Sequence, residues 1–243
     1  SCVAFEAMRF MNPTLNFQIT NVASLPLLES ENLGISSAIS DLASRAVNLS
    51  KTDWDEFETS WEFSTLGLID RKSQVKNIKA AWNDWSNECD RRIVELMGIE
   101  RENNRLFINA YGLQDELCPE VPEDQITLAR ADREKDCQRL ISYAIGCMMG
   151  RYSLDAPGLI YAHAGNVGFD PSRYPSFPAD ADGILPVTDQ PWFADDAAAR
   201  IREFLHAVWG PDTLEENLAW LAESLGAKAS ETPEETIRRY IAD

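Results

Sequence analysis

The chain is poor in positive charge. Its 243 residues include 22 lysines and arginines against 40 aspartates and glutamates, a formal net charge of -18 at pH 7, and the pI is near 4.5. Attraction to phosphate supplies most of the non-specific affinity of proteins that bind nucleic acids, so this composition argues against a stand-alone nucleic-acid binder. Because it describes only the surface as a whole, a local basic stripe that contacts a duplex stays possible.

Paired cysteines and long apolar runs are also missing. The cysteines are Cys2, Cys89, Cys118, Cys137 and Cys147. They are odd in number and never spaced as CxxC, so neither a disulfide framework nor a zinc site is predicted, and a reducing cytoplasm is the expected compartment. The longest apolar run, from Leu140 to Met149, is shorter than the about 20 residues that span a bilayer, and the N-terminus lacks a signal-peptide pattern. We expect no membrane association. Since the chain starts at Ser1 without a methionine and ends at Asp243 directly after a helical pattern, we also expect an excised piece of a longer protein.

Catalytic motifs are absent or incomplete. Residues 12–15, Asn-Pro-Thr-Leu, match half of the Asn-Pro-Pro-aromatic loop by which amino-methyltransferases hold a flipped base. The second proline, the aromatic residue and a preceding Gly-rich strand are missing, so a turn that leads into a strand is favoured. The aspartates between residues 180 and 189 lack the EF-hand pattern and predict a solvated acidic loop. His206 falls in a helical run, and His163 is only a weak candidate for a general base.

Residues 136–162 are the most apolar part of the chain. From Leu140 to Met149 nearly every position is apolar, which predicts a helix that is buried on all sides in the middle of a core. Gly150 is expected to end this helix. Residues 155–158 then predict a tight turn, and residues 159–162 a short buried strand.

The first sixty residues predict a strand and two helices. Alternating apolar side chains from Leu15 to Ile19 indicate a half-buried strand. Residues 33–47 show the spacing of an amphipathic helix. A capping box from Thr52 to Asp55 predicts a second, short helix. Its aromatic residues are expected to be core staples, and they are Trp54, Phe57 and Trp61.

Residues 72–111 carry the longest periodic pattern, with apolar side chains spaced alternately by three and four. This pattern predicts one long coiled-coil-like helix, or two helices interrupted near Gly98. The expected packing partner is the helix at residues 33–47 or the one at 134–149. A basic cluster begins the pattern and consists of Arg71, Lys72, Lys76 and Lys79. The three lysines are spaced to share one helical face, which is compatible with solvent exposure or with contact to DNA phosphates. A second, weaker polar cluster consists of Arg101, Asn103, Asn104 and Arg105.

The last third of the chain predicts a loop, a strand and three helices. Residues 165–183 predict a surface loop, and residues 184–187 are expected to pair as a strand with residues 159–162. The helices are expected at residues 195–209, 214–225 and 233–241, the last two capped by Thr213 and Thr232. The predicted fold is therefore mainly α, a long-helix bundle with a few short β-strands.

Five stretches taken together resemble one known family. They are Asn12-Pro-Thr-Leu-Asn-Phe-Gln18, Asp53-Trp-Asp-Glu-Phe-Glu-Thr-Ser-Trp-Glu-Phe63, Tyr111-Gly-Leu-Gln-Asp-Glu-Leu117, Gly150-Arg-Tyr-Ser-Leu-Asp155 and Leu214-Glu-Glu-Asn-Leu218. In this order, over nearly the whole chain, they look like the C-terminal part of the PglX-type adenine-specific DNA methyltransferases of BREX phage-exclusion systems. We name the family-signature residues Asn12, Pro13, Asn16, Phe17, Gln18, Trp54, Trp61, Tyr111, Gly112, Gly150, Arg151 and Tyr152.

The resemblance implies a parent protein that uses S-adenosylmethionine to methylate N6 of adenine in double-stranded DNA and that takes part in phage defence. In that family a methyltransferase domain precedes the target-recognition region. This chain resembles the end of the recognition region (1–30), a helical spacer with the long helix (31–125) and a C-terminal, mainly helical region with a small β element (126–243). The family's Asn-Pro-Pro-Tyr loop and its Gly motif for S-adenosylmethionine are missing from the sequence. No catalytic, cofactor-binding or metal-binding residue is therefore carried over, and we expect no methylation by the fragment alone.

Three functional interpretations follow. The fragment holds the recognition module at a set distance and docks onto DNA, onto the upstream domains or onto other defence proteins. Alternatively, it is a non-enzymatic acidic helical scaffold that recruits partner proteins. The net charge favours the scaffold, whereas the basic cluster favours DNA. The third interpretation, an independent enzyme that uses His163 and the acidic loop, is weak because the sequence positions no second catalytic group.

Overall fold

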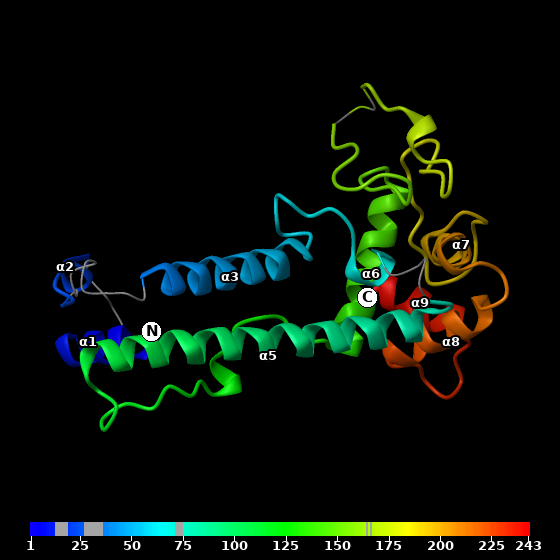
Figure 1. Ribbon diagram of the computed structural model, residues 1–243. Helices are drawn as coiled ribbons and strands as arrows, with labels where there is room; N and C mark the ends of the chain where they lie inside the picture. The colour runs from blue at the N-terminus through cyan, green and yellow to red at the C-terminus, as the bar shows by residue number, and fades with distance from the viewer. Residues whose placement is uncertain (13–18, 27–35, 71–74, 164, 166) are drawn as a thin grey trace. The chain divides into compact units, whose positions relative to one another are not determined.

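The computed structural model describes residues 1–12, 19–26, 36–70, 75–163, 165 and 167–243, and it shows helices joined by turns and loops (Figure 1). The chain divides into two compact units. Unit 1 comprises Ser1–Asp53 and Cys89–Ala129, and unit 2 comprises Trp54–Glu88 and Arg130–Asp243. Each unit is thus built from two separate stretches of sequence, because the chain leaves unit 1, returns to it and leaves it again.

Unit 1 is built on helix α3 (Ser36–Asp55) and the larger, C-terminal part of helix α5 (Ile78–Tyr111). Its core consists of Ile93, Leu96, Val121, Ile126 and Leu128, and Ala46 and Leu49 of α3 pack against it. The unit also contains α1 (Cys2–Met11), α2 (Ile19–Ala23) and the 3-10 helix η2 (Glu123–Gln125).

A buried amide ties α1 to the rest of unit 1. The side-chain oxygen of Asn104, on α5, accepts from the backbone N–H of Cys2 at 2.8 Å, and its amide nitrogen donates to the Pro119 carbonyl at 3.1 Å. Because an unpaired buried amide is costly, these bonds fix the start of α1 and the 119 segment on the same helix.

Unit 2 has its core among α6 (Arg133–Met148), α7 (Ala197–Trp209), α8 (Leu214–Ser224) and α9 (Pro233–Ala242), which pack on one another. It also holds α4 (Gly67–Asp70), the first turns of α5 and the 3-10 helix η4 (Pro171–Arg173). The large, fully buried side chains of these four packed helices are Leu140, Tyr143, Met148, Ile201, Phe204, Leu205, Leu218, Leu221 and Ile237.

A buried ion pair joins the start of α7 to α9. Asp196 is fully buried, and its carboxylate receives two hydrogen bonds from the guanidinium of Arg238, at 2.6 and 3.1 Å. The same carboxylate accepts from the backbone N–H of Ala199 at 2.9 Å and so caps α7. A single side chain therefore satisfies a helix end and fixes how two helices of unit 2 meet.

Most of the predicted helices are confirmed. The long pattern forms one helix, α5, which passes Gly98 without interruption. Both expected partners are used, since α3 packs against α5 within unit 1 and Trp82 of α5 donates to Asp136 of α6 at 3.1 Å within unit 2. Helix α6 is largely buried, although Ser142 is exposed. The three C-terminal helices are present, and Thr232 forms the predicted capping box.

The predicted strands are not found among the described residues. Residues 15–18 of the first strand lie outside them, and Ile19 begins helix α2. In the predicted strand pair the backbone groups bond elsewhere, because Ile160 donates to the Arg151 carbonyl at 2.9 Å and Ala197 donates to the Pro186 carbonyl at 2.9 Å. Proline at 186 also removes one donor that a ladder would need. The fold is therefore mainly helical without the expected β elements in the described part.

Two capping predictions are wrong. Thr52 lies inside α3, which begins at Ser36, and the carboxylate of Asp55 accepts from the Ser60 hydroxyl at 2.6 Å. The two residues therefore do not mark a helix start. The Thr213 hydroxyl accepts no capping bond from a backbone N–H of α8, and it donates to the Lys76 carbonyl at 3.1 Å.

The expected aromatic core staples of the 54–61 segment are also wrong in two of three cases. Trp54 is 58% exposed and Trp61 is fully exposed, whereas Phe57 is half-buried.

Among the described helices, none has both the length and the apolar character needed to cross a membrane. The three functional regions expected from the family resemblance stay a prediction.

Candidate functional site

The basic cluster is only partly on α5. Arg71 and Lys72 lie outside the described residues, Lys76 precedes the helix, and Lys79 lies in its first turn. The predicted shared helical face of the three lysines is therefore wrong, because the helix begins at Ile78. Lys76 and Lys79 are exposed and form no ion pair with a described carboxylate.

The sequence around these lysines fixes the start of α5. The side-chain oxygen of Asn77 accepts from the Ala80 N–H at 2.9 Å, as an N-cap does. The fully buried Asn217 of α8 accepts from the Ile78 N–H at 2.9 Å. The Asn77 amide also donates to Glu216 at 3.0 Å. Two of the free N–H donors of the first turn are thus satisfied, and the two lysine side chains extend from a fixed backbone.

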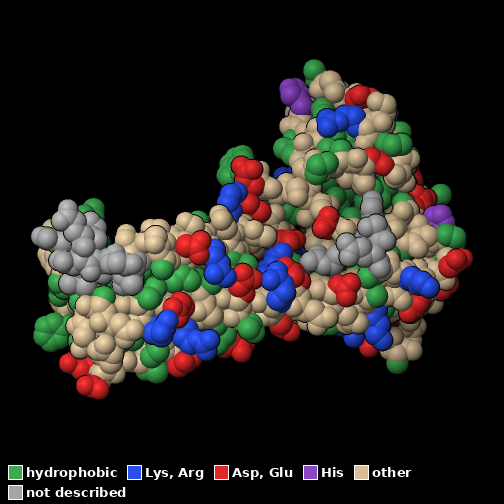
Figure 2. All heavy atoms as spheres, viewed as in Figure 1, with side chains coloured by type: hydrophobic (Ala, Val, Ile, Leu, Met, Phe, Trp, Pro, Cys, Tyr) green, Lys and Arg blue, Asp and Glu red, His purple; other side chains and the backbone are tan. Residues whose placement is uncertain are grey.

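The second polar cluster is not a basic surface. Arg105 bonds the carboxylate of Glu102 at 2.6 and 2.8 Å, and Arg101 lies 3.8 Å from Glu120. Asn104 is buried in the structural role described above. On the face that Figure 2 shows, lysines and arginines are likewise interspersed with aspartates and glutamates, and no continuous positive patch is visible.

Two of the signature stretches meet around Tyr152 in unit 2. The ring of Tyr152 stacks on Tyr143 with centroids 5.1 Å apart, and it meets the edge of Phe63 at 5.4 Å. Its hydroxyl donates to Glu58 at 3.2 Å. Burial raises the pKa of Tyr152 to about 12, and the negative charge of Glu58 adds to this shift. The hydroxyl therefore stays a donor at neutral pH.

Glycines make this packing possible. A Cβ atom at Gly146, on α6, would lie 2.6 Å from Cδ2 of Tyr152. Gly150 has φ +73°, and a Cβ there would lie 2.8 Å from the Phe169 ring. Its carbonyl accepts from the buried Tyr174 hydroxyl at 2.6 Å. The Gly-Arg-Tyr turn is thus held by close packing on both sides, since only glycine tolerates this backbone and this contact.

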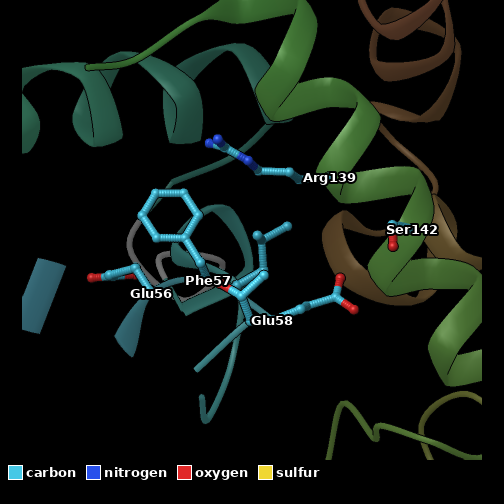
Figure 3. A pocket seen from close by; sticks show the side chains of 7 residues that line it. Glu56, Phe57, Glu58, Arg139 and Ser142 are labelled. Atoms are coloured by element: carbon cyan, nitrogen blue, oxygen red, sulfur yellow. The ribbon is translucent and has the colours of Figure 1, made fainter. Parts of the chain in front are cut away.

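Beside this aromatic cluster lies a cavity of about 380 Å³ between the 56–59 turn and α6 (Figure 3). Figure 3 shows Arg139 extending from α6 toward the Phe57 ring, and the guanidinium carbon lies 4.4 Å from the ring centroid. Arg139 also pairs at 2.8 Å with the buried Asp136. Burial raises the pKa of Asp136, and the hydrogen bond from Trp82 and the positive charge of Arg139 partly offset this rise. The arginine is therefore held in place by a carboxylate and an aromatic face.

A second cavity, of about 260 Å³, shares Glu58 and Thr59 with the first. We call it the Trp61 shelf, and it is lined by Glu58, Thr59, Ser60, Trp61, Phe63, Arg151, Tyr152 and Leu159. It combines two exposed apolar side chains with one arginine and one carboxylate. Such a surface can bind by stacking and by ion pairing.

The enzyme interpretation rests on His163 and the acidic loop. No group of three or more His, Cys, Asp or Glu side chains in the described part is placed to hold a metal ion. His163 and His206 are exposed. One carboxylate oxygen of Asp180 accepts from the backbone N–H groups of Gly183 and Ile184 at 2.9 and 3.2 Å. The acidic loop thus uses this carboxylate to order its own turn.

No protein-family model matches the chain. The chain is 39% identical over 254 residues to the adenine-specific methyltransferase BrxX of Escherichia coli O9:H4 (strain HS). This alignment covers 95% of the chain and 20% of that protein. The chain is also 37% identical over 254 residues to the adenine-specific methyltransferase PglX of Lacticaseibacillus casei (strain Zhang). This alignment covers 100% of the chain and 20% of that protein. The chain matches a segment of the PglX/BrxX adenine-specific methyltransferases. It spans about a fifth of the length of these relatives.

The described signature residues of the PglX/BrxX segment fall into two groups. Those of unit 2 gather at the Trp61 shelf and its supporting turn, and they are Trp61, Gly150, Arg151 and Tyr152; Trp54 lies at the end of α3. In unit 1, Asn12 follows α1, Gly112 follows α5, and the Tyr111 hydroxyl donates to the Pro26 carbonyl at 2.6 Å. The others lie outside the described residues and are Pro13, Asn16, Phe17 and Gln18.

Sequence reasoning missed the residues that complete the site, namely Phe57, Glu58, Arg139 and Leu159. Phe57 was expected in the core, and Glu58 is one of many acidic residues. Arg139 lies on a different element from the ring that it covers. The single signal in the sequence was that Trp61 and Arg151 both fall in stretches that resemble the family.

Proposed function

We propose that this chain is a helical, non-catalytic region of an N6-adenine-specific DNA methyltransferase and that it supports recognition of the DNA target. The observation that carries the proposal is the identity of 37–39% with two adenine-specific methyltransferases over nearly the whole chain. DNA is then the substrate of the longer protein. The rival interpretation, an acidic scaffold that never contacts DNA, is not favoured because both relatives are methyltransferases.

The chemistry of methyl transfer belongs to other parts of the longer protein in this proposal. A site for S-adenosylmethionine of the usual kind needs a Gly-rich turn between a strand and a helix. The described residues form no strand, and their glycines with positive φ lie singly in turns and at helix ends. These residues do not fit the cofactor, and the sequence lacks the Asn-Pro-Pro-aromatic loop that would hold a flipped adenine.

The contribution of this chain to DNA binding is assigned to the basic cluster. Lys76 and Lys79 are exposed and carry no ion pair with a described residue, and Asn77 and Asn217 fix the backbone between and beside them. Arg71 and Lys72 precede them in the sequence. Each contact between a lysine and a phosphate releases about one counterion and so adds about 0.9 to the slope of log affinity against log salt.

The test uses the full-length methyltransferase and labelled duplex DNA at several salt concentrations. The triple variant Lys72→Ala/Lys76→Ala/Lys79→Ala is expected to bind more weakly and to lower the salt slope by about 2 to 3. The matched control, Lys51→Ala/Lys135→Ala/Lys228→Ala, changes the net charge equally at other exposed lysines. Equal affinity and slope in the triple variant, the control and the wild type would refute the DNA contact.

A deletion tests the broader proposal. Removal of this whole region from the full-length methyltransferase is expected to reduce DNA affinity, target specificity and the methylation rate. Unchanged values of all three would show that the region does not support target recognition.

A further inference from the structure

Trp61 has the largest exposed fraction of any large hydrophobic side chain among the described residues. Its neighbours are nevertheless fixed. Ser60 is buried, and its hydroxyl donates to Asp55 at 2.6 Å. The Phe63 ring packs on Tyr143 and Tyr152 with centroids 6.1 and 5.4 Å away. The indole is thus held out into solvent by an ordered backbone, and it contributes nothing to the core of unit 2.

Two further side chains complete an unfilled surface beside Trp61. Leu159 lines the same cavity and is 60% exposed. Arg151 is exposed, forms no ion pair with a described carboxylate, and contacts the Tyr152 ring at 5.8 Å. The Arg151 carbonyl accepts from the Ile160 N–H at 2.9 Å, which keeps Arg151 and the 159–160 segment together.

The charges around the shelf favour a protein ligand over DNA. Among the described residues, Arg151 is the only cation that lines the cavity. Glu58 lines it as well, and the exposed Glu62 follows Trp61 in the chain. The Glu58 carboxylate balances the one guanidinium in the lining, so the shelf offers no excess positive charge to a phosphate backbone. Tryptophan and arginine are the residue types that contribute most often to protein–protein hot spots. The Glu58 carboxylate already accepts from Tyr152, so Arg151 is the charge that a ligand has to satisfy.

We propose that the Trp61 shelf binds another segment of the same, longer methyltransferase polypeptide. That segment places an apolar side chain against Trp61 and Leu159 and a carboxylate against Arg151. The inference rests on the proposed function, because it needs a longer protein of which this chain is a part. The length of the relatives supplies the occupant, since about four fifths of each one lies outside the matched segment.

Photo-crosslinking in the full-length protein tests this contact. Trp61 is replaced by p-benzoyl-phenylalanine, the protein is irradiated with duplex DNA present, and the crosslinked peptides are identified by mass spectrometry. We expect crosslinks within one polypeptide, to a peptide outside residues 1–243. The charge reversal Arg151→Glu is expected to lower their yield by about fivefold or more. The same probe at Trp192, which is exposed but does not line the shelf, is the control and should not give these crosslinks.

Four outcomes would overturn the inference: crosslinks only within residues 1–243, only to DNA, only to a separate protein, or none. Adenine methylation is measured on the same preparations before irradiation. A protein that methylates adenine but gives one of these four outcomes refutes the shelf contact alone. A protein that gives the expected crosslinks but never methylates adenine refutes the proposed function alone.

Discussion

Substitution of Gly146 by alanine tests the packing under the Trp61 shelf, because the ring of Tyr152 decides whether the substitution stabilises or destabilises the chain. Alanine in a helix interior is favoured over glycine by about 1 kcal/mol, so Gly146→Ala would ordinarily stabilise α6. Here the new Cβ would lie 2.6 Å from Cδ2 and 2.9 Å from Cε2 of Tyr152. Overpacking of a core costs about 1 to 3 kcal/mol. The Tyr152 ring is buried and stacked and cannot move away. We therefore expect Gly146→Ala to destabilise the chain by up to about 2 kcal/mol.

Removal of the Tyr152 ring should turn the destabilising effect of Gly146→Ala into a stabilising one. The single substitution Tyr152→Ala is expected to cost about 3 to 5 kcal/mol, as for other buried aromatic side chains. In that background no atom of residue 152 opposes the new methyl group, so adding Gly146→Ala should stabilise by about 1 kcal/mol. The assay is urea unfolding of the four proteins, followed by circular dichroism. A Gly146→Ala effect of the same sign in both backgrounds would refute the reasoning, because the two residues would then be energetically independent.

Three further predictions follow from buried groups. Because burial raises the pKa of Tyr152 to about 12, the unfolded chain loses this proton first, near pH 10, and the free energy of unfolding should fall between about pH 10 and 12. Urea unfolding across this range should show a smaller fall in Tyr152→Phe, and equal falls would contradict the shift. Arg238→Met leaves the buried Asp196 unpaired and should cost about 3 to 5 kcal/mol. Lys135→Met removes only an exposed pair with Asp132 and should cost less than about 1 kcal/mol in the same measurement, so similar losses would argue against the buried pair. In the folded chain the exposed Cys118 should react with a thiol reagent well before the buried Cys89, Cys137 and Cys147. Burial raises the pKa of Cys137 to about 12, so rapid labelling of Cys137 without denaturant would exclude the described packing.

The long, periodic segments were predictable from the sequence because their pattern reflects the side chains that the core buries. The pattern of residues 72–111 gave the end of α5 at Tyr111 and placed its start six residues before Ile78, and the C-terminal helices followed the same rule. Local signals without periodicity were less reliable. The capping box of Thr52 and Asp55 was wrong because α3 begins at Ser36 and continues through both residues. A local pattern of two residues cannot show that the helix has already begun well before them.

The strand pair failed for a related physical reason. Short apolar runs such as residues 159–162 satisfy the pattern of a buried strand, but their backbone groups need partners. The backbone N–H of Ile160 finds its partner in the Arg151 carbonyl, and the run forms a connection without regular secondary structure. The candidate site was predictable only in part. Trp61 and Arg151 lay in stretches that resemble the family, whereas Phe57 and Arg139 meet only in three dimensions.

The interleaved units have a consequence for synthesis on the ribosome. Unit 1 needs residues 89–129 to close its core, so residues 54–88 leave the ribosome before either unit is complete. Those residues include the first turn of α5, where the Ile78 N–H donates to Asn217, a residue that is synthesised much later. Nascent chains generally fold unit by unit from the N-terminus. In this chain, the segment that carries Trp61 therefore stays without its partners while unit 1 forms, because Tyr143 and Tyr152, on which Phe63 packs, are made only after residue 129.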